Sequence, residues 1–205
     1  MKVAVVGGTG SFGQAVAKRL VEAGVEVVIG SRDAERAREA ALELGAEGRE
    51  NADAVRGVDL VLLAVKADAA VETASELREQ IGRTPVLSVA AELTFGPGGV
   101  EPTEEPTSVA QRIQAVLEGP VVAGLHSLAA ASLSTQPADE DALVCGDDAD
   151  AKALALELAS RLVTGRAVDA GPLASARALE GMTAVIVNVN KRYKAHAGLR
   201  VTGLH

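Results

Sequence analysis

A glycine-rich turn between a β-branched segment and a helical pattern constrains the fold of this chain more than any other feature. Residues 3–6 read Val-Ala-Val-Val, which is typical of a strand buried on both faces of a parallel sheet. Over residues 11–21 the apolar positions recur at helical spacing. The turn has the spacing G-x-G-x-x-G, which in this context indicates a dinucleotide-binding βαβ unit. We therefore predict a pyrophosphate site at the positive end of the helix, formed by Gly8, Thr9, Gly10, Ser11, Phe12 and Gly13. The alternative is a glycine-rich turn without a ligand.

The residues after the second predicted strand (25–29) indicate which dinucleotide binds. NAD-binding units usually carry an acidic residue here, which accepts the ribose 2′-hydroxyl and repels a 2′-phosphate. This chain instead has Ser31 and Arg32, with Arg36 one helical turn later. A hydroxyl and two guanidinium groups are suited to donating hydrogen bonds to a phosphate, so the pattern favours NADP(H). The alternative is solvated charge at the start of a helix.

Strand and helix patterns alternate along the following residues, which predicts an α/β fold with a Rossmann-type, doubly wound parallel sheet. Residues 90–106 contain Gly-Pro-Gly-Gly and further prolines, so we expect a surface loop of functional length. Further strands are expected at 60–65, 86–89, 121–124, 143–145 and 167–169, and helices at 34–44, 51–56, 68–80, 108–117 and 151–162.

The C-terminal part carries a long apolar stripe at alternating steps of three and four over residues 173–193. We expect this helix to have no sheet position left to cover, and therefore to pack against a second subunit in a homodimer. The predicted organisation is a NADP-binding Rossmann domain over residues 1–165 and a small C-terminal helical extension over 166–205, which completes the acceptor site and the dimer interface.

Composition excludes several classes of function. The net charge of −8 argues against a nucleic-acid-binding protein. The single cysteine, Cys145, excludes an internal disulfide and a cysteine-based metal site, and we interpret it as a small buried hydrophobe. The chain starts directly in a strand pattern, and its apolar runs fall well short of the roughly 18 residues that span a bilayer. We expect a cytoplasmic protein with no membrane partner and no metal.

From residue 1 to about residue 204 the chain resembles the reduced coenzyme F420:NADP oxidoreductase family. The motifs that carry the resemblance are KVAVVGGTG at 2–10, VIGSR at 28–32, LHS at 125–127, VCGDD at 144–148 and DAGPL at 169–173. The resemblance implies hydride transfer between NADP(H) and the deazaflavin coenzyme F420, a homodimer, and NADP binding by Thr9, Ser31, Arg32 and Arg36. We also place Val65, Lys66 and Ala90 at the cofactor. The chain departs from the family's usual Pro at Lys66 and from Pro-Ala at Ala129-Ala130, where the deazaflavin pocket is shaped.

His126 follows a predicted strand end, where ligands of open α/β sheets bind. We predict it as the catalytic residue, which either hydrogen-bonds a ring or manages the proton that accompanies the hydride; a structural histidine is the alternative. With Leu128, Arg200 and Leu204 it forms the predicted substrate site. We interpret Asp147 and Asp148 as caps of the next helix.

Lys191, Arg192, Lys194 and Arg200 form a basic group in an otherwise acidic chain. This group is suited to attracting the polyanionic tail of coenzyme F420. The alternative is that the cations complement the dipole at a helix C-terminus. Two other functions remain open on the residues alone: an NADPH-dependent reductase of a flavin, ferric iron or an imine, and a non-catalytic NADP(H)-sensing regulator.

Overall fold

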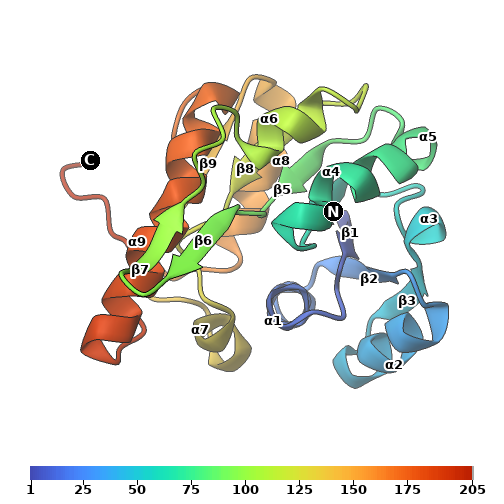
Figure 1. Ribbon diagram of the computed structural model, residues 1–205. Helices are drawn as coiled ribbons and strands as arrows, with labels where there is room; N and C mark the ends of the chain where they lie inside the picture. Colours follow the sequence, from blue (N-terminus) through green and yellow to red (C-terminus); the bar gives the residue numbers. More distant parts are fainter. Residues whose placement is uncertain (205) are drawn as a thin grey trace.

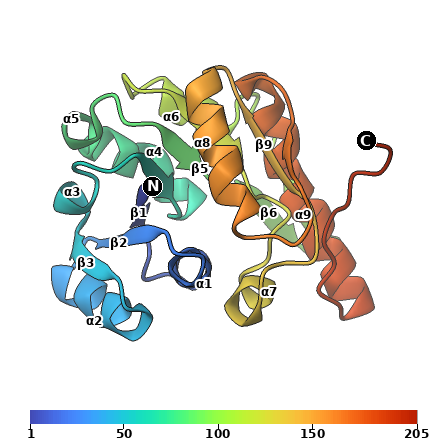
Figure 2. The same cartoon turned by 180° about the vertical axis from the view of Figure 1, so that it is seen from behind.

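The computed structural model describes residues 1–204 and has a sheet of eight strands between two layers of helices (Figures 1 and 2). The strand order is β10-β9-β8-β5-β4-β1-β2-β3. The strands of this sheet are β1 (Lys2–Val6), β2 (Glu26–Ser31), β3 (Glu47–Glu50), β4 (Leu60–Leu63), β5 (Val86–Ser88), β8 (Val121–Gly124), β9 (Ala142–Gly146) and β10 (Ala167–Asp169). The helices are α1 (Ser11–Glu22), α2 (Ala34–Leu44), α3 (Asn51–Ala54), α4 (Ala67–Glu76), α5 (Arg78–Ile81), α6 (Val109–Gln114), α7 (Ala130–Thr135), α8 (Ala149–Ser160) and α9 (Ala176–Tyr193).

Alternate residues of each strand point to opposite helical layers. Val3 and Val5 of β1 belong to the core that includes residues of α1, α2 and α8. Ala4 and Val6 belong to the core on the other face, with residues of α4, α6 and the first half of α9. Both faces are therefore apolar, which explains why the strands read as continuous hydrophobic runs.

The sheet is mostly parallel, and the predicted Rossmann-type fold is confirmed. One pair differs, because β8 and β9 are antiparallel. The chain between them contains the short helix α7 and enters β9 at the edge where it left β8, so no crossover along the sheet is made. β10 lies beyond the boundary proposed at residue 165 and pairs with β9 in the same sheet.

Two local predictions in the N-terminal half need correction. The helix expected over 68–80 is broken into α4 and α5. The edge strand β3 was not predicted, because its sequence Glu-Gly-Arg-Glu carries no apolar signal. Its Gly48 lies so close to α2 that a Cβ atom there would come 2.3 Å from the carbonyl oxygen of Ala37.

The surface loop expected over residues 90–106 contains regular structure that was not predicted. The segment forms an antiparallel hairpin of β6 (Leu93–Gly96) and β7 (Gly99–Pro102), which lies against α9 in both views of the molecule (Figures 1 and 2). The Asn188 side chain holds it, because its Oδ1 accepts the N–H of Val100 at 2.8 Å and its Nδ2 donates to the Val100 carbonyl at 2.7 Å. This contact comes from a residue 88 positions away, so the local sequence did not reveal the strands.

The expectation that the C-terminal helix covers no part of the sheet is wrong for its first half. Ala176 and Leu179 of α9 are buried in the same core as Val86 and Val121. The second half extends past the sheet and leaves Val185 and other apolar groups exposed. Within residues 1–204 the structure holds no helix with the length and apolarity that a bilayer crossing requires.

Candidate functional site

A cavity of about 610 Å³ lies at the edge of the sheet where β1, β2 and β4 end. Seven residues predicted from the sequence line it, namely Thr9, Gly10, Ser31, Arg32, Arg36, Val65 and Lys66. The sequence did not reveal seven others, Gly7, Asp33, Asn51, Ala64, Asp68, Ala69 and Thr73. The predicted loop and the predicted cofactor-selecting residues therefore belong to one site.

The glycine loop brings α1 close to the end of β1. A Cβ atom on Gly13 would lie 2.5 Å from the carbonyl oxygen of Gly7, so only glycine allows this approach. Gly10 precedes the helix without a side-chain cap, which leaves the N–H groups of the first turn available to an anion in the cavity. Of the predicted loop residues, Gly8, Ser11, Phe12 and Gly13 do not line the cavity. Gly8 and Gly13 allow the close backbone approach of the turn, and Phe12 packs against the core.

The end of β2 supplies the donors predicted for a phosphate. The Ser31 hydroxyl accepts the N–H of Asp33 at 3.2 Å, which leaves its own proton free to be donated. Asp33 caps α2 by accepting the N–H groups of Glu35 and Arg36 at 2.9 and 3.3 Å. Within residues 1–204 neither the Arg32 nor the Arg36 guanidinium forms an ion pair, so both remain available to a ligand.

His126 lies at the neighbouring strand end and is 7% exposed. Its Nε2 donates to the Ala90 carbonyl at 3.2 Å, so two predicted site residues meet between the ends of β5 and β8. Burial lowers the pKa of His126 to about 4, and the hydrogen bond to Ala90 opposes this only in part. The imidazole is therefore uncharged at neutral pH. Neither residue lines the large cavity.

The backbone around His126 is held tightly. Leu125 adopts the left-handed conformation, with φ of 66°, which is strained for a residue with a side chain. The carbonyl of His126 accepts a hydrogen bond from the Thr183 hydroxyl of α9 at 3.0 Å. Its Nδ1 is buried and has no partner among residues 1–204. The fold thus fixes the backbone of His126 through α9 and its ring through the Ala90 carbonyl.

The other predicted substrate residues are Leu128, Arg200 and Leu204, and none of them lines the large cavity. Leu128 is buried in the core, and Arg200 forms an ion pair with Asp139. Leu204 is half exposed, and its carbonyl accepts a hydrogen bond from Arg166 at 3.1 Å. Their role at the acceptor stays a prediction.

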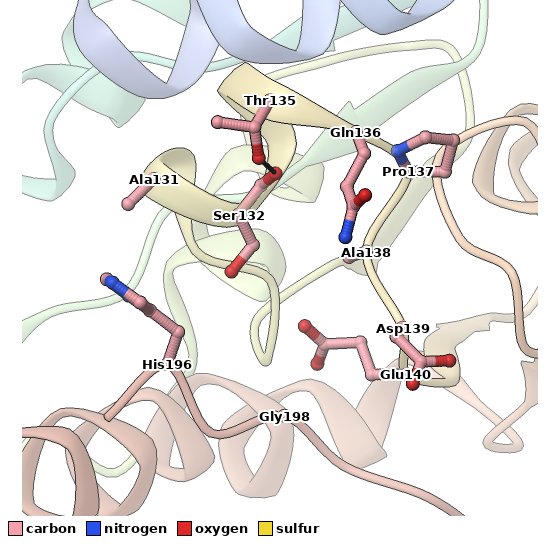
Figure 3. A pocket seen from close by; sticks show the side chains of 10 residues that line it. All are labelled: Ala131, Ser132, Thr135, Gln136, Pro137, Ala138, Asp139, Glu140, His196 and Gly198. Carbon is pink, nitrogen blue, oxygen red and sulfur yellow. Dashed lines mark hydrogen bonds between the residues drawn. The ribbon is translucent and has the colours of Figure 1, made fainter.

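A second cavity, of about 410 Å³, separates α7 from the C-terminal tail (Figure 3). It is lined by polar groups that include Ser132, Gln136, Glu140 and His196, and the Thr135 hydroxyl at its edge donates to the Ser132 carbonyl. None of the predicted substrate residues lines it.

A buried carboxylate, which no sequence motif singled out, holds the tail. Asp141 accepts the N–H groups of Arg166 and Val201, both at 2.8 Å, and these hydrogen bonds lower its pKa. The N–H of Asp141 in turn donates to the Leu199 carbonyl at 2.7 Å. The tail beyond α9 is therefore fixed against the start of β9 and β10.

The other residues singled out in the sequence, Cys145, Asp147 and Asp148, have structural roles. Cys145 is fully buried, and burial raises its pKa to about 11, which keeps the thiol protonated. Asp148 caps α8 through the N–H of Ala151, as predicted, whereas Asp147 accepts the N–H of Leu173 and ties down the approach to α9. The prediction that both cap the same helix is therefore wrong for Asp147. Within residues 1–204 no group of His, Cys, Asp or Glu side chains is arranged to hold a metal ion.

Comparisons with known proteins agree with this geometry. A family model described as NADP oxidoreductase coenzyme F420-dependent matches residues 2–92. The chain is 34% identical to the F420-dependent NADP reductase of Methanocaldococcus jannaschii, over all of this chain and 99% of that protein. It is 36% identical to the protein of the same name from Methanothermobacter thermautotrophicus, over all of this chain and 96% of the relative.

Two solved structures share the fold over all or most of this chain. A crystal structure from Arthrobacter sp. FB24, provisionally assigned as an F420-dependent NADP-reductase, superposes with a TM-score of 0.84 at 26% identity and covers all of both chains. A pyrroline-5-carboxylate reductase from Coxiella burnetii superposes with a TM-score of 0.60 at 16% identity, over 82% of this chain and 57% of that one. The second likeness concerns the fold alone.

Proposed function

This chain belongs to the F420-dependent NADP reductase family, to whose members it is 34% and 36% identical over its full length, and on that premise we propose how its residues serve the reaction. The protein is an NADP-dependent oxidoreductase that transfers a hydride between NADP(H) and the deazaflavin coenzyme F420. The observation that carries the residue assignments is the single cavity shared by the glycine loop and the Ser31-Arg32-Arg36 group.

NADP(H) lies along this cavity with its 2′-phosphate at the end of β2 and its nicotinamide toward the ends of β5 and β8. Its pyrophosphate binds the first turn of α1, where backbone N–H groups and the helix dipole favour negative charge. Its 2′-phosphate lies between Arg32 and Arg36 and accepts the Ser31 hydroxyl proton. The nicotinamide end then points past Val65 and Lys66 toward the strand ends that carry Ala90 and His126. Lys66 adds a cation where the family often has Pro.

Hydride transfer between a nicotinamide and a deazaflavin is chemistry that the two coenzymes supply when bound. The chain contributes positioning, because two stacked rings at contact distance need no protein nucleophile. An uncharged His126, locked by Ala90 and Thr183, fits a residue that orients a ring better than one that exchanges protons at neutral pH. We place the deazaflavin against this edge, with Leu128 behind His126 and the tail residues Arg200 and Leu204 at its outer side.

A homodimer is part of the proposal, and we place its interface on the outer half of α9 and the hairpin. Val185 is 59% exposed, Tyr193 70% and Phe95 69%, and all three lie on these two neighbouring elements. Such exposed apolar groups favour burial against a second copy of the chain.

A reducing cytoplasm suits the free thiol of Cys145.

The cofactor assignment is tested by replacing Arg32 with Ala and measuring NADPH and NADH binding by nucleotide fluorescence. We expect NADPH affinity to fall by about tenfold or more, as one charged hydrogen bond contributes about 1.5–3 kcal/mol, with little change for NADH. Arg38→Ala, an exposed arginine of α2 that does not line the cavity, is the matched control. Equal losses for both nucleotides would show that the 2′-phosphate is bound elsewhere.

A further inference from the structure

Asn51 is the one amide side chain that lines the large cavity. It begins α3 directly after β3, and β3 pairs with β2 so that Glu50 lies opposite Ser31. Asn51 therefore stands beside the phosphate-binding group, although the two segments are far apart in the sequence. It belongs to none of the sequence motifs described above.

The Asn51 side chain is packed tightly and incompletely satisfied. The residue is 8% exposed, and its Oδ1 lies 2.9 Å from the place where a Cβ atom of Gly30 would stand. A Cβ atom at position 30 would force the amide to shift. Oδ1 is buried and finds no hydrogen-bond partner among residues 1–204. An unpaired buried polar atom is unfavourable, so its presence beside a ligand cavity requires an explanation.

The surroundings indicate which part of a dinucleotide the amide meets. The two arginines of the cavity come from the β2–α2 connection, whereas α4 contributes Ala69, Thr73 and the acidic Asp68 on another wall. The arginines favour a phosphate, whereas the uncharged and acidic side chains of α4 favour an uncharged base. An amide carries a donor and an acceptor side by side, which matches the paired donor and acceptor on an edge of adenine.

We propose that Asn51 is a cofactor-binding residue that recognises the adenosine portion of the nucleotide through its side-chain amide, and that Gly30 is required to seat it. This inference rests on the proposed NADP(H) site. Rotation of the amide about its Cβ–Cγ bond exchanges its two ends, so the side chain is able to present either the donor or the acceptor to the base. In contrast to Arg32, Asn51 contributes affinity without selecting between NADPH and NADH.

The test compares Asn51→Ala with Asp53→Ala, an exposed residue of the same helix outside the cavity. Binding is measured for NADPH, NADH and reduced nicotinamide mononucleotide, which lacks adenosine. We expect Asn51→Ala to weaken NADPH and NADH by the same factor, about tenfold, and to leave the mononucleotide unchanged. Unchanged NADPH binding, a loss confined to NADPH, or an equal loss for the mononucleotide overturns the proposal.

A double-mutant cycle with Gly30→Ala tests the seating of the amide. The added Cβ displaces Asn51 in the wild-type background, so Gly30→Ala weakens NADPH binding there, whereas it costs little more once Asn51 is already Ala. An equal further loss in both backgrounds contradicts the proposal. Thermal unfolding checks that each variant is folded, and Asn51→Ser replaces Asn51→Ala if the latter is not. If the wild-type protein does not bind NADPH, or if Arg32→Ala binds NADPH as tightly as the wild type, the proposed function is refuted instead.

Discussion

Replacing His126 by Gln should reduce the amount by which the free energy of unfolding falls at low pH. The imidazole is buried and hydrogen-bonded to the Ala90 carbonyl, and its Nδ1 has no partner among residues 1–204 that could accept a hydrogen bond from a second ring proton. Protonation is therefore unfavourable in the folded protein, where the pKa lies at about 4, compared with the ordinary value of 6.5 in an unfolded chain. Gln is able to keep the hydrogen bond to Ala90 and has no proton to gain.

The sign of the effect follows from where the protons bind. Below about pH 6.5 the unfolded chain takes up a proton on His126, whereas the folded chain does so only near pH 4, so the free energy of unfolding falls as the pH falls. A pKa difference of one corresponds to about 1.4 kcal/mol. The full difference therefore corresponds to about 3 kcal/mol, of which about 2 kcal/mol has been lost by about pH 5.

Urea unfolding of wild-type protein and His126→Gln at pH values from about 8 to about 5 measures this contribution. Buried Glu140 and Glu180, whose pKa values are raised by burial, act in the opposite direction and are present in both proteins, so they cancel in the difference. We expect the wild type to lose about 2 kcal/mol more than the variant over this range. Parallel pH profiles for the two proteins would refute a buried, neutral His126.

Two further changes test other parts of the structure. Gly13→Ala places a Cβ atom 2.5 Å from the Gly7 carbonyl, so we expect α1 to move. The free energy of unfolding should fall by about 1–3 kcal/mol, and NADPH affinity should fall at least tenfold. In the control Gly96→Ala the added Cβ atom meets no atom within 4 Å, so neither stability nor NADPH affinity should change. Val185→Asp should convert the dimer to a monomer in sedimentation experiments, whereas Leu42→Asp, on the exposed face of α2, should not; a monomeric wild type would contradict the proposed interface.

The nucleotide half of the molecule was predictable because its signals are local. The loop spacing and the helix pattern over residues 34–44 each determine nearby backbone geometry, and the structure confirms them. The same local signals identified most of the polar lining of the large cavity. Asn51 escaped prediction because the preceding strand is a charged edge strand, which is formed by pairing with β2 and not by its own composition.

The acceptor half was less accessible to sequence reasoning because long-range contacts build it. The hairpin depends on Asn188 of α9, and the antiparallel β9 depends on how the chain turns through α7. Asp141, which fixes the tail, looked like any acidic residue in a loop until the structure placed it beside Arg166 and Val201. Residues that act through partners distant in the sequence carry no local signature.

The most direct test of the account is a turnover measurement with purified protein, NADPH and coenzyme F420, in which oxidised F420 loses its visible absorbance as the deazaflavin is reduced. We expect turnover well above the rate without enzyme, little turnover with NADH, and none above background when a flavin, ferric iron or an imine replaces F420. NADPH binding without turnover of any acceptor would favour a cofactor-sensing regulator. Reduction of another acceptor with no reduction of F420 would contradict the proposed hydride transfer.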